Sequence, residues 1–495
     1  MFRRSLLALP ALVLPARAQA AARVSLLHMN DFHSRHRPVA TNSTDCREGQ
    51  DCFGGSARLA TAFAQERARL DGRAHLLLDA GDQFMGSLFY SHHRGLAEAA
   101  VQNAIGTSAM ALGNHEFDHG PATLARYAAA VPFPLLSANL DTTDEPLLHG
   151  RITARAEFRL NGARIVVVGL TTPDTPGVSS PGPRLRFRDP EEATDRAIWE
   201  ARRDGPCTVV VLSHLGLGAD RRLAEAVRGI DVIVGGHSHT LLGNGLPGAA
   251  GPYPVAAGGA RIVQAGAHGR WIGRLDLDLG ADGRVLVAAG NTRVLGADLP
   301  EDPAVAAMVA RLAEPLEELR RRPVATLPRA LDNAGCGRAA CEVGEMVAEA
   351  LRQSFSDAQI GFMNAGGIRT GLPAGSVTWG DVLTMLPFQN TASRMVLRGA
   401  VLREAVESGI ARLPSAAGRF PQVSGMRFTP GPPLVIEVRQ GDTWQPLDPE
   451  RAYVVATNNF LRAGGDGYTM FRDAALEAYD QGQSLEEALV ALLSR

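Results

Sequence analysis

The sequence predicts a mixed fold of strands and helices, of the α/β or α+β class. Short apolar runs typical of buried strands recur in the first half of the chain, and most are followed directly by a polar or glycine-rich segment. These runs are Val24–Leu27, His75–Leu78, Ile165–Gly169, Val209–Leu212 and Val232–Val234. Such alternation favours a functional site in the loops at the strand ends. At 495 residues the chain is long enough for two or three domains.

The first twenty residues have the pattern of a secretory signal peptide. Arg3 and Arg4 precede an apolar stretch over 5–15, and a small-residue cleavage site ends at Ala18 or Ala20. The stretch is too short to span a membrane, and its two prolines disfavour the alternative of a buried N-terminal helix. We therefore expect a periplasmic or secreted protein without a stable membrane anchor.

Lysine is absent from the chain, and all 50 basic residues are arginine. This excludes enzymes that depend on a lysine, such as Schiff-base enzymes and P-loop enzymes. The formal charge is only −2 at pH 7 and the chain has no basic tract, which argues against nucleic acid as a partner. We expect small-molecule partners, and the sequence leaves the oligomeric state open.

The five cysteines fit an exported protein. Cys46 and Cys52 are six positions apart and Cys336 and Cys341 are five apart, so two short-range disulfides are expected in an oxidising compartment. Reduced thiols are the alternative, which the signal peptide disfavours. Cys207 begins an apolar run and is expected to be a buried free thiol.

Five motifs place metal-binding side chains directly after expected strands. They are Asn30-Asp31-Phe32-His33, Gly81-Asp82, Gly113-Asn114-His115-Glu116-Phe117-Asp118, Ser213-His214 and Gly235-Gly236-His237-Ser238-His239. Loops at strand ends converge, so we expect one cluster of metal donors. The donors are Asp31, His33, Asp82, Asn114, His214, His237 and His239. A single histidine after a strand would more often be an ordinary loop residue, but five ordered motifs are not expected by chance.

Seven donors exceed the needs of one four- to six-coordinate ion. Two divalent ions about 3.5–4 Å apart that share Asp82 account for the number, and such a pair suits phosphoester hydrolysis. The first ion would bind Asp31, His33, Asp82 and His239. The second would bind Asp82, Asn114, His214 and His237. This mixture of imidazole, carboxylate and amide donors suits zinc or manganese.

His115 and Asp118 are expected to form a catalytic pair beside the ligand Asn114. A histidine three residues from a carboxylate can be kept cationic, and it can then stabilise charge on the phosphoryl or leaving-group oxygen. The alternative is that Asp118 only caps the following helix. The other histidines near the motifs lack comparable spacing, and we expect His28 to be partly buried in the first strand and the rest to lie in loops or at the surface. The rest are His92, His93, His119 and His268.

A change of pattern near residue 300 indicates a helix between two domains. Asp302 is a suitable N-cap, Pro303 suits the first helical position, and apolar residues then recur at helical spacing. Arg320-Arg321-Arg322 suits the C-terminal end of a helix, and Pro323 would stop it. The expected segments are a signal peptide over 1–20, an N-terminal domain over 24–299, a linker helix over 300–322 and a C-terminal domain over 323–495.

The order of the metal motifs resembles that of the 5′-nucleotidase family of two-domain metallophosphoesterases. The resemblance runs from Val24 to about Arg472. It implies an α+β fold, in which a four-layered α/β/β/α metallophosphoesterase domain is joined by the linker helix to a smaller α/β C-terminal domain that binds the nucleotide. It also implies that the domains rotate about this helix.

The C-terminal half carries further motifs of this family. Asn364-Ala365-Gly366-Gly367-Ile368-Arg369 resembles its Asn-x-Gly-Gly-x-Arg loop, and the resemblance implies that Asn364 and Arg369 contact nucleoside and phosphate. Leu386-Pro387-Phe388 and Asn459-Phe460 resemble the segments whose rings, here Phe388 and Phe460, sandwich the base. Gly464-Gly465-Asp466-Gly467 resembles the loop whose carboxylate, here Asp466, holds the ribose hydroxyls. Stacking rings, a bidentate arginine and an accepting carboxylate suit these roles. Without the motifs, the two phenylalanines would be expected in the core.

The chain departs from relatives at two points. Gly337 follows Cys336 where the animal enzymes carry a phosphate-contacting arginine, and it stays open whether Arg338 replaces that arginine. His239 stands where some relatives have Asn or Gln, which leaves the metal preference open.

The resemblance implies a 5′-nucleotidase that splits nucleoside 5′-monophosphates into nucleoside and phosphate. Related enzymes leave three alternatives: a UDP-sugar or NAD pyrophosphatase, a 2′,3′-cyclic nucleotide phosphodiesterase/3′-nucleotidase, and a thiosulfohydrolase. Phe388, Phe460 and Asp466 favour a nucleotide over a sulfur substrate. A nucleotide-binding protein without turnover is a further alternative, which the complete donor set disfavours. The base preference stays open.

Overall fold

The computed structural model describes residues 20–41, 46, 49–480 and 482–495. The expected signal peptide therefore lies outside the described residues, apart from Ala20. Among the described helices, none combines the length and the apolar character needed to cross a membrane.

Two sheets form the N-terminal domain. The first has seven strands in the order β15 (Val285–Val294), β14 (Trp271–Leu279), β1 (Ala22–Met29), β2 (Ala74–Asp79), β3 (Ala109–Ala111), β4 (Leu135–Leu136) and β6 (Ile152–Thr153). The second has six strands in the order β12 (Val255–Ala257), β13 (Ala260–Val263), β11 (Val232–Gly235), β10 (Thr208–His214), β8 (Ala163–Thr171) and β7 (Arg155–Leu160). A small ribbon pairs β5 (Leu140–Asp141) with β9 (Arg186–Phe187). All five expected strands are confirmed, as parts of β1, β2, β8, β10 and β11.

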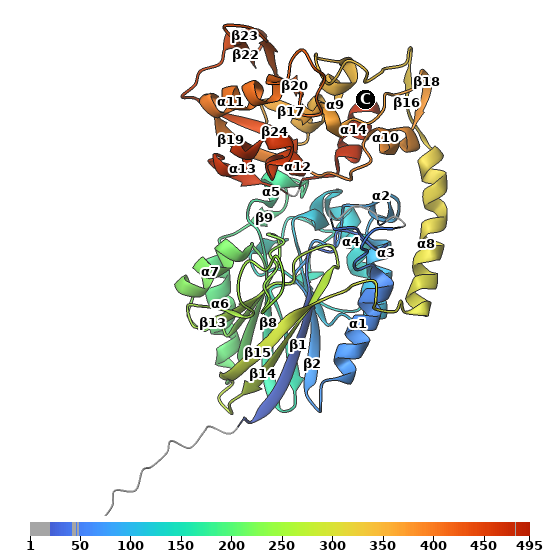
Figure 1. The fold of residues 1–495 in the computed structure, drawn as a ribbon. Coiled ribbons are helices and arrows are strands. Elements are labelled where there is room, and N and C mark those ends of the chain that lie inside the picture. The colour runs from blue at the N-terminus through green and yellow to red at the C-terminus, as the bar shows by residue number, and fades with distance from the viewer. Residues whose placement is uncertain (1–19, 42–45, 47–48, 481) are drawn as a thin grey trace, which may run out of the picture.

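The main core lies between these sheets, and helices cover their outer faces (Figure 1). Side chains alternate across a strand, so Leu76 and Leu78 of β2 join the core between the sheets while Leu77 packs against the helices. The first sheet is covered by α1 (Ser56–Ala68), α3 (Leu96–Ile105) and α4 (Gly120–Ala130), and the second by α6 (Pro190–Arg203) and α7 (Leu217–Ala226). Two short helices, α2 (Leu88–His93) and α5 (Thr175–Val178), lie in loops. The expected four-layered α/β/β/α arrangement is confirmed.

Helix α8 (Pro303–Arg321) connects the two halves of the molecule (Figure 1). It begins as the sequence predicts, because Asp302 accepts hydrogen bonds from the backbone N–H groups of Ala304 and Val305 and Pro303 is the first helical residue. Its apolar side packs on α1 and α2. The helix thus packs on the N-terminal domain over most of its length, and it also contacts the C-terminal domain.

The C-terminal domain is built around a five-stranded mixed sheet. The strand order is β20 (Pro421–Ser424), β17 (Ile360–Asn364), β24 (Ala452–Asn458), β19 (Ala392–Arg398) and β25 (Glu477–Tyr479). Further strands are β16 (Pro323–Leu327) with β18 (Gly375–Thr378), and the ribbon of β21 (Met426–Thr429), β22 (Val435–Gln440) and β23 (Thr443–Pro446). The helices are α9 (Glu342–Gln353), α10 (Trp379–Met385), α11 (Gly399–Ile410), α12 (Asn459–Arg462), α13 (Thr469–Asp473) and α14 (Leu485–Leu493).

Both expected disulfides are present, Cys46–Cys52 and Cys336–Cys341, and Cys207 is a buried free thiol as predicted. The expectation for His28 is wrong in degree. Its side chain is fully buried rather than partly buried, and its Nε2 lies 2.8 Å from the hydroxyl of Tyr253. The ring lies on the side of β1 that carries Val24 and Leu26 and that faces the core between the sheets, where Tyr253 also lies.

Candidate metal centre

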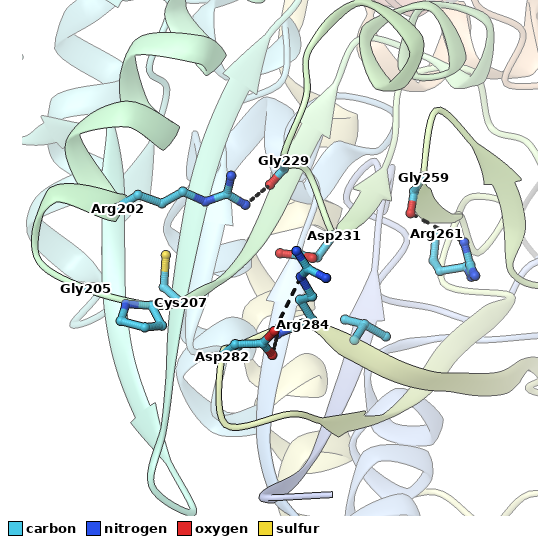
Figure 2. Close-up of a pocket in the computed structure, with 12 residues that line it drawn as sticks. Arg202, Gly205, Cys207, Gly229, Asp231, Gly259, Arg261, Asp282 and Arg284 are labelled. Atoms are coloured by element: carbon cyan, nitrogen blue, oxygen red, sulfur yellow. Dashed lines mark hydrogen bonds and ion pairs between the residues drawn. The ribbon is translucent and has the colours of Figure 1, made fainter. Parts of the chain in front are cut away.

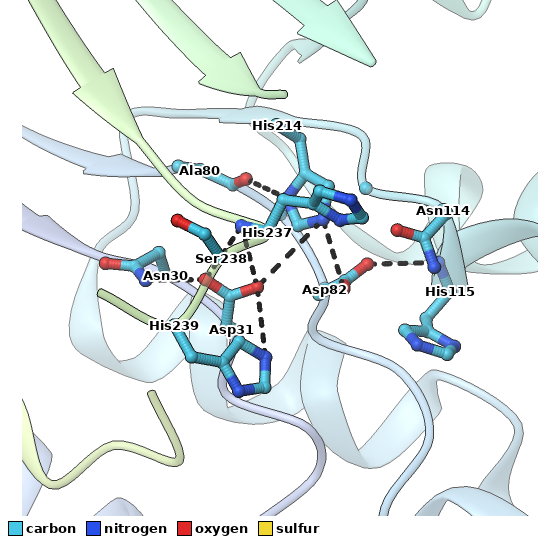
Figure 3. Close-up of polar contacts among 12 residues, drawn as sticks. Asn30, Asp31, Ala80, Asp82, Asn114, His115, His214, His237, Ser238 and His239 are labelled. Atoms are coloured by element: carbon cyan, nitrogen blue, oxygen red, sulfur yellow. Dashed lines mark hydrogen bonds and ion pairs between the residues drawn. The ribbon is translucent and has the colours of Figure 1, made fainter. Parts of the chain in front are cut away.

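The seven predicted donors converge at one end of the two sheets, and all of them except His33 are labelled in Figure 3. They follow β1, β2, β3 and β11, or end β10, and they therefore lie at the carboxyl ends of strands from both sheets. Five of them are buried, His237 is half-buried, and His239 keeps 23% of its side chain exposed. The spacing of the motifs thus predicted a cluster that the fold assembles.

The donors assigned to the first ion face one another. The Nε2 atoms of His33 and His239 lie 2.9 Å apart. His239 Nε2 is 3.5 Å from Asp31 Oδ1, and His33 Nε2 is 3.9 Å from Asp82 Oδ2. Two imidazole nitrogens that face each other beside two carboxylates form a set suited to a divalent cation.

The donors assigned to the second ion form an adjoining set. Asp82 Oδ2 is 3.0 Å from His214 Nε2, and the donor atoms of Asp82, His214 and His237 all lie within 4.8 Å of one another. His214 Nδ1 donates to the carbonyl of Ala80 at 2.6 Å, which turns Nε2 toward the cluster. Asn114 Oδ1 and His237 Nδ1 are buried without a hydrogen-bond partner among the described residues. Such atoms are expected to have partners, and a metal ion would supply one.

The pKa shifts in the cluster favour metal binding at four of the donors. Burial lowers the pKa of His237 to about 3 and that of His239 to about 4, and burial together with His239 lowers the pKa of His33 well below its usual range. Burial alone would raise the pKa of Asp82, but His214 and His115 outweigh burial and hold this pKa well below its usual range. These three imidazoles are therefore neutral and Asp82 is ionised, the forms that bind metals. Two other donors differ: burial would lower the pKa of His214, but Asp82 outweighs burial and raises it to about 9, and burial raises the pKa of Asp31 to about 7. His214 must therefore release a proton when a metal ion binds.

The ligand loops have strained backbones. Five predicted donors have left-handed φ angles: Asp31 at 49°, His33 at 50°, Asp82 at 57°, His237 at 70° and His239 at 52°. A non-glycine residue in this region costs about 1–3 kcal/mol, and such residues persist where the surroundings enforce them, often at functional sites. The folded chain therefore accepts strain to aim these side chains inward.

Glu116 fixes two of these loops. It lies in a short 3₁₀ turn over His115–Phe117 and is fully buried. Its carboxylate accepts four backbone N–H groups, from Asp82 at 3.0 Å, Gln83 at 2.8 Å, Phe84 at 3.2 Å and Gly113 at 2.7 Å. One side chain thus ties the loop of Asp82 to the loop of Asn114.

His115 and Asp118 form the predicted pair. His115 Nδ1 lies 2.6 Å from Asp118 Oδ2, and Ser179 Oγ donates to Asp118 Oδ1 at 2.8 Å. Asp118 does not cap helix α4, because His119 occupies the N-cap position. Burial would lower the pKa of His115, but Asp118 and Asp82 outweigh it and raise this pKa to about 10. The ring is therefore cationic at neutral pH, with a buried Nε2 that has no hydrogen-bond partner among the described residues.

Comparison with known proteins places this site in a family. Residues 24–241 match the calcineurin-like phosphoesterase family, and residues 321–473 match the 5′-nucleotidase C-terminal domain. The chain is 33% identical to snake venom 5′-nucleotidase of Naja atra, over 91% of this chain and 92% of that protein, and 32% identical to 5′-nucleotidase of Bos taurus, over 96% and 89%. The structure of a 5′-nucleotidase precursor from Thermus thermophilus is similar with a TM-score of 0.63 at 36% identity, and the match covers 95% of this chain and 96% of that one.

The chain belongs to the 5′-nucleotidase family.

Membership makes this chain a metal-dependent phosphoester hydrolase. The calcineurin-like phosphoesterase domain implies divalent metal ions, and the clustered histidines and aspartates are where they can bind.

A cavity of about 440 Å³ lies between the two domains of this 5′-nucleotidase family member, beside the metal cluster. His33 and His239 line it from the N-terminal domain, and Phe388, Asn459 and Arg462 are among the residues that line it from the C-terminal domain. The cavity therefore connects the metal cluster with the domain that the resemblance assigns to the nucleotide.

A larger cleft of about 720 Å³ lies elsewhere (Figure 2). Arg202, Cys207, Asp231 and Arg284 are among its lining residues. They lie near the amino ends of β10 and β11 and in the turn between β14 and β15, so this cleft is at the opposite end of the sheet from the cluster. Ligands of parallel sheets bind at the carboxyl ends of strands, so we place the functional site at the cluster despite the larger volume here.

The predicted nucleotide-binding residues fall into two groups. Asn364 Nδ2 donates to Asp466 Oδ2 at 2.8 Å, and the Phe460 ring lies so close to Gly465 that a side chain there would clash. Arg369 lies over the ring of Phe388 at 5.9 Å. Of the five predicted residues, Phe388 alone is among the described residues that line the interdomain cavity.

The two phenylalanines are surface residues rather than core residues. Phe388 is 41% exposed and Phe460 is 45% exposed. Large exposed aromatic rings are available for stacking on a ligand. The alternative of ordinary core aromatics is therefore wrong.

Three residues at the site were missed from the sequence. His268 lies in a loop, as expected, but the sequence did not predict that its ring would lie beside those of His33 and His239. Glu116 was part of a quoted motif without a role, and Tyr479 of the C-terminal domain contacts Asn114. The segment Ala267-His268-Gly269 between two strands resembles the other ligand motifs and was the one available signal for His268.

Proposed function

We propose that this chain is a 5′-nucleotidase that hydrolyses nucleoside 5′-monophosphates to nucleoside and inorganic phosphate. The observation that carries the proposal is the interdomain cavity, in which the metal cluster faces the exposed ring of Phe388 across a space of about 440 Å³. One nucleotide could span this cavity, with its phosphoryl group at the metal-binding residues and its base stacked on Phe388.

Two divalent ions, zinc or manganese, would be held by the seven donors. Asp31, His33, Asp82 and His239 would hold the first ion. Asp82, Asn114, His214 and His237 would hold the second. When bound, such a pair supplies Lewis acidity toward the phosphoryl oxygens and activates water for attack. The buried Asn114 Oδ1 and His237 Nδ1 support this assignment because they lack partners within the described chain.

His115 would stabilise the charge that develops on the phosphoryl group or the leaving oxygen. Asp118 holds its Nδ1, which leaves the cationic Nε2 as the free donor. Preorganised donors of this kind typically lower barriers by a few kcal/mol. Protonation of the leaving nucleoside oxygen by the same group would complete the hydrolysis.

Phe388 and Phe460 would stack on the base, Arg369 would bind the phosphate, and Asn364 and Asp466 would bind the nucleoside. Asn364 contacts Asp466 and Arg369 lies over Phe388, which supports these assignments. Because four of these five residues lie away from the cavity lining, a change in domain orientation about α8 would be needed to engage them all. The exposure of both rings is compatible with this movement.

The protein would act outside the cytoplasm, in the periplasm or after secretion. Two disulfides support this location, since such bonds persist in oxidising compartments. Fractionation of cells that express the full chain, with immunodetection of the mature protein, tests the location.

A substrate panel tests the function. Purified protein loaded with Zn, Mn or Co would be assayed for phosphate release from 5′-AMP, 3′-AMP, a 2′,3′-cyclic nucleotide, UDP-glucose, NAD and a thiosulfate conjugate. We expect the highest kcat/KM with 5′-AMP, and an Asp82→Asn variant serves as the metal-site control. A higher kcat/KM for any other member of the panel would overturn the 5′-nucleotidase assignment and would identify the preferred substrate class instead.

A further inference from the structure

His268 lies in the loop between β13 and β14, next to the donors assigned to the first ion. Its ring centroid is 5.5 Å from that of His33 and 5.3 Å from that of His239. Donor nitrogens of the three imidazoles all lie within 4.8 Å of one another. The backbone N–H of His268 donates to the carbonyl of Asp31 at 2.7 Å, so this loop is fastened to the first ligand loop.

The backbone of His268 has the same unusual conformation as five of the seven predicted ligands. Its φ angle is 61°. Within the described chain, the histidines with positive φ are His33, His237, His239 and His268, and all four point into this cluster. Strain of this kind is kept where a side chain must be aimed, and an ordinary loop histidine has no need of it.

We propose that His268 is a further ligand of the first metal ion. This ion would then be held by three imidazoles, from His33, His239 and His268, and by the carboxylates of Asp31 and Asp82. The inference rests on the metal pair proposed above. Ligands bound at about 2.0–2.1 Å can lie at most about 4.2 Å apart, so nitrogens now within 4.8 Å need only a small side-chain shift.

The extra imidazole makes the two metal sites chemically different. The first site would offer three nitrogens and two carboxylates, whereas the second would offer two nitrogens, one carboxylate and one amide oxygen. Imidazole favours zinc and other borderline metals, while oxygen donors suit manganese. The first site should therefore prefer zinc over manganese more strongly than the second site does.

Zinc binding by the metal-free protein tests the proposal directly. We would titrate the wild type and the His268→Asn variant with Zn²⁺ in a buffered-metal series and measure bound metal by mass spectrometry. Asparagine tolerates positive φ, so the loop should keep its shape. We expect the wild type to bind two zinc ions. In the variant, the zinc affinity of one site should fall about tenfold or more, while the affinity of the other site should be unchanged. Cobalt substitution should show a matching loss in the absorption of one ion.

Two further variants make the result decisive. His268→Gly also suits the left-handed backbone, so it replaces His268→Asn if circular dichroism shows that the asparagine variant is misfolded. His92→Asn removes an exposed histidine of α2 and should leave both affinities unchanged. Two ions bound with wild-type affinity in the folded His268 variants would overturn the proposal, and reduced turnover in that case would make His268 a substrate contact. A wild type that binds no zinc pair would instead refute the metal centre on which the proposal rests.

Discussion

Tyr479 of the C-terminal domain accepts a hydrogen bond from Asn114 of the metal cluster, with 2.7 Å between Asn114 Nδ2 and the tyrosine oxygen. The Tyr479 ring also stacks on His237, with centroids 6.0 Å apart. One residue of the second domain thus covers two residues assigned to the second ion. The domains are therefore docked in an arrangement that shields this side of the cluster.

Removing the Tyr479 hydroxyl should loosen this docking. A neutral hydrogen bond contributes about 0.5–1.5 kcal/mol, so Tyr479→Phe should reduce the docked population and raise kcat/KM for para-nitrophenyl phosphate roughly two- to tenfold. The matched control is Tyr453→Phe in the same sheet. It removes a hydroxyl that accepts a hydrogen bond from the backbone N–H of Asp448. Lower kcat/KM in the Tyr479 variant alone would mean that its hydroxyl assists the reaction.

Asp82→Asn should abolish binding of both ions, because one carboxylate is assigned to both sites. Asparagine keeps the size of the side chain and tolerates the positive φ, so the fold should persist. Metal content after dialysis is the measurement, and hydrolysis should be lost with it. The control is Asp231→Asn. The Asp231 carboxylate accepts a hydrogen bond from the Val209 N–H at the other end of the sheet, away from the predicted donors. Two tightly bound ions in Asp82→Asn would rule out the bridging role.

His115→Ala should separate catalysis from metal binding. We expect metal content near two ions per chain and turnover lower by roughly 10²–10⁴, because the proposed role of the ring is to stabilise charge on the substrate. His119→Ala, an exposed neighbour that hydrogen-bonds Tyr90, should retain normal turnover. Loss of an ion in His115→Ala would make His115 a ligand, which its position within 4.8 Å of His33 and Asp82 donors allows.

Replacing Phe388 and Phe460 together by alanine should affect only substrates that carry a base. Each stacking face contributes about 1–3 kcal/mol by analogy with single-stranded nucleic-acid platforms, so kcat/KM for 5′-AMP should fall steeply. Hydrolysis of para-nitrophenyl phosphate should be nearly unchanged, because both side chains are exposed and their loss leaves the core intact. Unchanged kcat/KM for 5′-AMP would show that these rings do not bind the base.

Stability at low pH should depend on Glu349 in α9. Burial would raise the pKa of Glu349, but hydrogen bonds from Arg352, Ser424 and Gln353 outweigh it and lower the pKa to about 2. A depressed pKa stabilises the fold above the unfolded value of about 4.5, and this contribution is lost as the pH falls toward 2. Glu349→Gln should therefore lower Tm most at neutral pH, with the difference from wild type shrinking below about pH 4.5. A difference in Tm that is constant with pH would contradict this assignment.

Local sequence patterns were sufficient to predict the apolar strands of the N-terminal domain, the helix that follows Asp302, and the convergence of the seven candidate donors. The four layers, in contrast, were implied by the resemblance to a family. An apolar strand followed by a short polar loop places its donor at the carboxyl end of that strand wherever the strand sits in the sheet. Asp302 and Pro303 defined the start of α8 for the same local reason.

Contacts between residues of separate helices, strands or domains depend instead on the tertiary structure. His268 follows a different strand from His33 and His239, and its contact with them depends on the position of β13 beside β11. Tyr479 reaches Asn114 from 365 residues away, across the domain interface. Such contacts arise from sheet order and domain orientation, which depend on packing summed over many residues. The segment Ala267-His268-Gly269 resembles the ligand motifs but does not show which residues His268 contacts, and no short motif near Tyr479 indicates its contact with Asn114.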